Sequence, residues 1–280
     1  MRGREPLFVW ILFGLVTVEI LVTYSRVPAN ELYHVSRSGL AGGASRALVF
    51  LNFSTALVAI ALVALVYTQL PNRALRALAV VAALLCAPVF WPGVVSQADL
   101  DARWVNAPAA VVVALALSLT GSMHARVNAH RGDRVRLALG VLALLAAPPW
   151  LAADLGFFLN GVPVLGSIYE TGPHFVHHGH HHGMDGVLLV LAALLLSRAL
   201  PAIRARALRL VTAAYLALML SYGIGNVAND FWLEQVVKRG WTGWAIPSVL
   251  EPGLTWAWAV LIAGAAAVWL LWFRDLLETA

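Results

Sequence analysis

The sequence predicts an all-α integral membrane protein, a bundle of about eight transmembrane helices with both termini in the cytoplasm. Its composition is the first reason, because 61% of the residues are hydrophobic and 12% are charged, against about 25% charged in soluble domains. The second reason is a series of long apolar runs, most of which reach the roughly 17–25 residues that cross a bilayer as a helix. The third is the placement of the positive charges, which indicates the orientation.

The expected helices follow eight apolar runs, which cover residues about 7–23, 47–69, 76–95, 107–123, 135–158, 184–200, 207–228 and 253–273. We interpret the first run as a retained helix and expect Pro148 and Pro149 to distort the fifth. The connections are short, so we predict one polytopic domain over residues 1–280. Its extracytoplasmic loops would lie at about 24–46, 96–106, 159–183 and 229–252.

The orientation comes from the lysines and arginines. With the N-terminus inside, 13 of the 19 fall in cytoplasmic segments and 6 in outer ones. This asymmetry accounts for the net charge of +5 without a nucleic-acid partner. We expect the protein in a plasma membrane of the bacterial type. The single cysteine, Cys86, excludes a disulfide within the chain and a cysteine-based metal site.

A histidine-rich segment lies between the fifth and sixth runs. Residues 171–185 read TGPHFVHHGHHHGMD and hold six of the nine histidines of the chain. A helix that began at Pro173 would place one stripe of side chains on one face and leave His180 pointing away. The stripe would consist of His174, His177, His178, His181, His182 and Asp185. Imidazoles at positions i and i+4 can bind one metal ion, and Asp185 could be a ligand or fix an imidazole tautomer.

A flexible histidine-rich loop is the alternative, because Gly179 and Gly183 each cost a helix roughly 1 kcal/mol relative to alanine. Further carboxylates could complete a metal site, and the topology brings four of them to the outer side: Glu19, Asp154, Glu170 and Asp230. A donor set of imidazoles and carboxylates without thiolate suits iron, copper or zinc. Since the polar residues gather in the outer half of the bundle, we expect a pocket that opens outward rather than a conduit.

Two family resemblances bear on this segment. The run HFVHHGHHH resembles the histidine boxes of membrane-bound fatty-acid desaturases and hydroxylases, which spread their histidines over separate boxes on the cytosolic side, so no residue role is carried over. Residues 180–186, HHHGMDG, are similar to the HHxxxDG motif of condensation-domain and wax-ester-synthase-type acyltransferases. That resemblance implies His181 as a base, although those enzymes are large soluble two-lobed folds.

The sequence therefore predicts a membrane-embedded metal-dependent enzyme with a histidine-rich transition-metal site at the extracytoplasmic mouth. Its substrate would be lipophilic. The density of histidines favours an oxidoreductase, and a metal-dependent hydrolase or transferase is the alternative reaction class. The alternatives are a non-catalytic metal-binding subunit of a membrane complex and a transition-metal transporter or chaperone. The expected partners are the lipid bilayer, a lipophilic small molecule and other membrane subunits. The sequence assigns no catalytic residue.

Overall fold

Helices form almost all of the regular structure. The computed structural model describes residues 2–3, 5–32, 34–90, 101–104, 106–120, 125–126, 132–157, 159, 161–166, 179–250 and 252–273. Its α-helices are α1 (Glu5–Arg26), α2 (Gly39–Asn52), α3 (Ser54–Tyr67), α4 (Arg73–Cys86), α5 (Asn106–Thr120), α6 (Asp133–Ala146), α7 (Pro148–Asp154), α8 (His182–Ser197), α9 (Arg206–Trp232) and α10 (Trp256–Val268).

Short elements complete the described part of the chain. Two-residue strands β1 (Arg2–Gly3) and β2 (Ala125–Arg126) pair in antiparallel fashion. The 3₁₀ turns are η1 (Ala29–Glu31), η2 (Ala87–Phe90) and η3 (Leu200–Ala202). The π-helical turns η4 (Leu233–Val237) and η5 (Trp269–Phe273) continue α9 and α10.

The all-helical class is confirmed, and several helices are apolar enough to span a membrane. Three spans pass by length and composition alone, namely α1, residues Arg206–Val237 and residues Trp256–Phe273. The number rises to five if each bent pair is one span. One pair is α2 with α3, bent by 41°, and the other is α6 with α7, bent by 49°. Eight crossings and the cytoplasmic termini stay predictions.

Several expected boundaries differ from the structure. The predicted loop 24–46 is helical in its second part, because α2 begins at Gly39, where φ is +65°. The run 47–69 is not one helix but bends at Phe53, which separates α2 from α3. The predicted loop 229–252 begins inside α9 and η4. The distortion expected at Pro148 is present, since α7 starts there with proline in its first turn.

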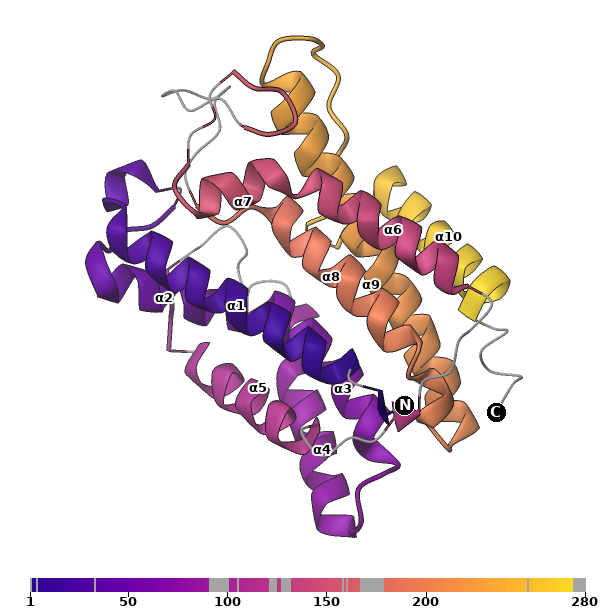
Figure 1. Cartoon of the computed structure of the whole chain (residues 1–280). Helices are drawn as coiled ribbons and strands as arrows, with labels where there is room; N and C mark the ends of the chain where they lie inside the picture. Colours follow the sequence, from indigo (N-terminus) through magenta and orange to yellow (C-terminus); the bar gives the residue numbers. More distant parts are fainter. Residues whose placement is uncertain are drawn as a thin grey trace.

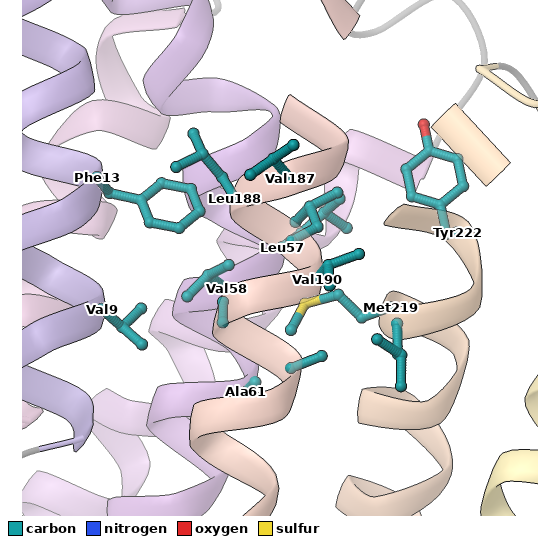
Figure 2. Close-up of a cluster of buried hydrophobic side chains, with 14 of the residues drawn as sticks. Val9, Phe13, Leu57, Val58, Ala61, Val187, Leu188, Val190, Met219 and Tyr222 are labelled. Atoms are coloured by element: carbon teal, nitrogen blue, oxygen red, sulfur yellow. The ribbon is translucent and has the colours of Figure 1, made fainter. Parts of the chain in front are cut away.

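Helix α8 lies in the middle of the bundle, with α1 on one side and α9 on the other (Figure 1). It is apolar on every face between Asp185 and Ser197, which is typical of a helix that is buried all round. Figure 2 shows its side chains in the core, where Val187 and Leu188 meet Phe13 of α1 and Leu57 of α3.

Glycines allow the close contact of α8 with α9. A Cβ atom at Gly186 would lie 2.7 Å from the Gly223 carbonyl oxygen, and one at Gly223 would lie 2.8 Å from the Gly186 carbonyl oxygen. Small residues at such contacts let two helix backbones approach within a membrane. The first turns of α8 are thereby held at a fixed distance from the polar end of α9.

We expect Gly186→Val to destabilise the bundle by about 1–3 kcal/mol, because the added methyl groups force the two backbones apart. Thermal unfolding in detergent micelles measures the change. The matched control is Gly14→Val on α1, where an added Cβ meets nothing within 4 Å. Equal melting temperatures for the two variants would show that this contact does not limit stability.

Candidate metal centre

Three ionisable side chains from separate elements meet at the end of the bundle where α8 begins. They are Glu19 on α1, Asp154 at the end of α7 and His180, two residues before α8. One potential ligand atom from each lies within 4.8 Å of those from the other two. Glu19 is half-buried, whereas Asp154 and His180 are buried. This group could hold a metal ion.

The backbone around Gly179 explains why His180 faces this group. Gly179 has φ +114°, a conformation that favours glycine, and a side chain there would collide with the hydroxyl of Tyr24. The next residue donates its backbone N–H to that hydroxyl over 3.0 Å. His181 is extended, with φ −103° and ψ 151°, and α8 starts only at His182. The helical stripe predicted through residues 179–181 is therefore wrong.

Both ring nitrogens of His180 contact carboxylates. Nδ1 lies 3.1 Å from Asp154 Oδ2, and Nε2 lies 3.0 Å from Asp185 Oδ1. The hydroxyl of Ser54 donates to the same oxygen of Asp185 over 2.7 Å. An imidazole that ligates a metal usually donates its other N–H to a carboxylate, which fixes the tautomer and the ring orientation. Asp185 is placed for that role if His180 Nδ1 is the metal ligand.

The protonation of His180 follows from the same contacts. Burial lowers the pKa of its imidazole, but the carboxylates of Asp185 and Asp154 outweigh burial and raise the pKa to about 10. Without a metal, the ring is therefore an imidazolium that donates from both nitrogens at neutral pH. A metal ion at Nδ1 would replace one of those protons and keep a positive charge between the carboxylates.

Two carboxylate oxygens at the group lack a hydrogen-bond partner among the described residues. They are Asp154 Oδ1 and Glu19 Oε2. Asp154 is 1% exposed, so bulk solvent does not reach this oxygen. The other oxygen of Glu19 accepts a hydrogen bond of 2.9 Å from the Thr23 hydroxyl, which also contacts the Asp154 carbonyl. A buried oxygen without a partner is costly unless a cation satisfies it.

A second group of buried polar side chains lies beside the first. His181 Nε2 is 3.4 Å from Glu234 Oε1, and Trp150 Nε1 donates to Glu234 Oε2 over 2.9 Å. Asp230 Oδ2 accepts a hydrogen bond of 2.6 Å from the backbone N–H of Gly183, close to the start of α8. This second group ties the start of α8 to α7, α9 and η4.

The carboxylates outnumber the buried cations in this part of the structure. Five acidic side chains gather around the start of α8: Glu19, Asp154, Asp185, Asp230 and Glu234. Against them, the described residues supply three cations. They are the imidazolium of His180, the buried guanidinium of Arg46, which lies 5.8 Å from the Tyr24 ring centroid, and the half-buried Lys238, whose charge acts on Asp230 and Glu234. Unpaired carboxylates are strongly disfavoured at low dielectric, so protons or metal cations must balance the excess.

The structure brings together some of the residues that the sequence singled out. Glu19 and Asp154 meet at one group, and Asp185 contacts the histidine of that group. His182 Nδ1 lies 4.0 Å from Asp185 Oδ2. His181 and Asp230 lie in the second group. The other four candidates, His174, His177, His178 and Glu170, lie outside the described residues.

Sequence reasoning missed two residues. The expectation that His180 points away from the site is wrong, because it assumed a helix through Gly179. That glycine was the signal for a break. The sequence predicts a loop at Glu234, whereas the structure buries it in the π-helical turn that extends α9.

Comparison of the chain with models of protein families, with curated proteins and with solved structures gives no match, so the functional argument rests on the geometry of the centre.

Proposed function

We propose that this protein is a membrane-embedded metal-dependent enzyme whose transition-metal ion is held by Glu19, Asp154 and His180. One observation carries the proposal: three potential ligand atoms converge within 4.8 Å, and two carboxylate oxygens of the same residues are without a hydrogen-bond partner among the described residues. Asp185, which accepts a hydrogen bond from Ser54, would orient the imidazole through its Nε2 atom.

The donor set favours iron or zinc. Two carboxylates and one imidazole are oxygen-rich, and Cys86 packs in a separate core among α3, α4 and α5. Copper(I) prefers softer sulfur ligands, whereas iron and zinc accept mixed imidazole and carboxylate ligands. Iron would favour redox chemistry, and zinc would favour hydrolysis or group transfer by a metal-activated hydroxide.

Three protein ligands leave coordination positions for water or substrate, as catalytic metal sites require. The outer face of α1 next to Glu19 is apolar, with Val18 and Val22 exposed. A substrate that reaches the half-buried carboxylate along this face would be lipophilic, because the same face suits the lipid acyl chains.

The apolar core next to the candidate metal centre argues against a transporter. Figure 2 shows Val9 and Phe13 of α1, Val58 and Ala61 of α3, and Val190 of α8 packed between the helices. A route for a metal ion needs polar groups along its length to replace the hydration shell. The described core offers apolar side chains here instead.

Elemental analysis of the purified protein tests the metal. We expect near-stoichiometric iron or zinc in the wild type and a large loss in Asp154→Asn, which keeps the shape of the side chain but removes its charge. Glu31→Gln is the matched control, since Glu31 is exposed in η1. Metal at the wild-type level in Asp154→Asn would refute the proposed ligand set.

Azide tests for an open coordination position. We expect it to change the visible spectrum of the cobalt(II)-loaded protein, because a small anion binds where substrate would bind. An unchanged spectrum in protein that holds stoichiometric cobalt would indicate a closed site. The enzyme proposal would then fail in favour of a non-catalytic metal-binding subunit.

A further inference from the structure

A cavity of about 570 Å³ lies at the other end of the bundle from the metal centre. The cavity is open to solvent and is lined mainly by two turns, residues 68–71 after α3 and residues 201–204 after α8. The turns meet where the Arg204 backbone N–H donates to the Thr68 hydroxyl over 3.4 Å. Figure 1 places the end of α8 and the start of α9 near the N-terminus, far from α7 and the start of α8.

The lining of this cavity is basic. Arg76 and Arg204 contribute to it, and none of its described lining residues is acidic. The Nε atom of Arg76 donates to the Leu70 carbonyl over 3.1 Å, which holds the guanidinium at the rim. Arginine pairs recognise phosphate oxygens well because their N–H groups form a planar fork.

An apolar surface continues from the cavity along α4. Val80 and Leu84 follow Arg76 at four-residue steps, so the three side chains share one helix face. Val80 is 44% exposed and Leu84 65% exposed in the described part of the chain. A ligand that filled the cavity with a phosphate would thus find an apolar track of about two helical turns directly below it.

We propose that this cavity binds the headgroup of an anionic phospholipid, with the phosphate at Arg76 and Arg204 and an acyl chain along Val80 and Leu84. The continuity of a basic cavity with an exposed apolar helix face favours a lipid over free phosphate, which would use only the arginines. Basic pockets between helix ends are suited to anionic headgroups. The orientation predicted from the arginines would place the site at the cytoplasmic leaflet.

Native mass spectrometry of the full-length protein in detergent tests the proposal with three probes. They are phosphatidylglycerol, phosphatidylcholine with the same acyl chains, and inorganic phosphate. We expect phosphatidylglycerol to bind in preference to the other two. Arg76→Gln combined with Arg204→Gln should weaken that binding by about tenfold or more, since each arginine contributes to attraction of an anionic headgroup.

The matched control is Arg73→Gln combined with Arg206→Gln, which removes the same charge at the same end outside the cavity. It should bind phosphatidylglycerol as the wild type does. Ala202→Phe should also weaken binding, because it fills the cavity without changing the charge.

Three results would overturn the proposal. Equal losses in the two double variants would indicate non-specific charge attraction. Binding of inorganic phosphate as strong as that of phosphatidylglycerol would identify a soluble anion as the ligand. Full binding by Ala202→Phe, in protein with the wild-type melting temperature, would exclude the cavity as the site.

Discussion

Replacing His180 with alanine should reduce the metal content of the purified protein to background. The substitution removes the nitrogen donor of the proposed centre and leaves Asp154 and Asp185 without their shared hydrogen-bond partner. Two buried carboxylates would then face each other without a cation between them, which adds to the loss. Metal analysis after dialysis, together with titration of the stripped protein with zinc, measures the effect.

Imidazole added to the His180→Ala protein supplies a more specific test. The deletion leaves a space next to Phe50, whose ring centroid lies 5.3 Å from that of His180. Free imidazole that enters this space should restore part of the zinc binding. His34→Ala is the control, because His34 lies exposed in the loop between α1 and α2. Full metal content in His180→Ala would contradict the assignment of His180 as a ligand.

Zinc affinity should rise by at least about tenfold for each pH unit between about pH 6 and pH 8, and so by at least about a hundredfold over that range. The carboxylates of Asp185 and Asp154 raise the pKa of His180 to about 10, so a metal at Nδ1 must displace a proton throughout this range. Isothermal titration of the stripped protein with zinc at three pH values gives the slope. A flat profile would show that His180 loses no proton when zinc binds.

The stability of the metal-free protein should fall as the pH rises, whereas the zinc affinity rises. A pKa raised above the ordinary value of 6.5 stabilises the fold fully below about pH 6.5, and this stabilisation is lost as the pH rises toward 10. The melting temperature of the metal-free form should therefore fall with pH while the gain from added zinc grows. Asp185→Asn is the informative variant, because removal of that charge lowers the pKa of His180 and should weaken both trends.

The class of the protein was predictable because it depends on composition. Apolar runs form helices irrespective of detail, since a buried backbone must satisfy its own hydrogen bonds. The bends within the apolar runs were harder to predict from the sequence. Pro148 predicts the bend between α6 and α7, but no proline or glycine indicates a bend at Phe53, where α2 and α3 separate. A break there depends on tertiary packing, which a single sequence does not reveal.

The carboxylates of the candidate centre could be anticipated and the histidine could not. Glu19 and Asp154 stand out because charged groups are expensive in an apolar helix. His180 required knowledge of the local backbone, which Gly179 reverses at φ +114°. Helical periodicity was extended back through Gly179 although α8 begins only at His182, and it therefore gave the wrong direction for the histidine of the group. Glu234 was missed for a related reason, because η4 prolongs α9 beyond its apolar part.

The origin of the three proposed ligands has a consequence for assembly of the chain. His180 and Asp154 are 26 residues apart, while Thr23, one turn after Glu19, is 131 residues from Asp154. A bound ion would therefore close one short and one long loop, as a covalent cross-link does. It would restrict the unfolded chain most strongly through the long loop. Metal capture would then mark the moment when the N-terminal helix docks on the second half of the protein.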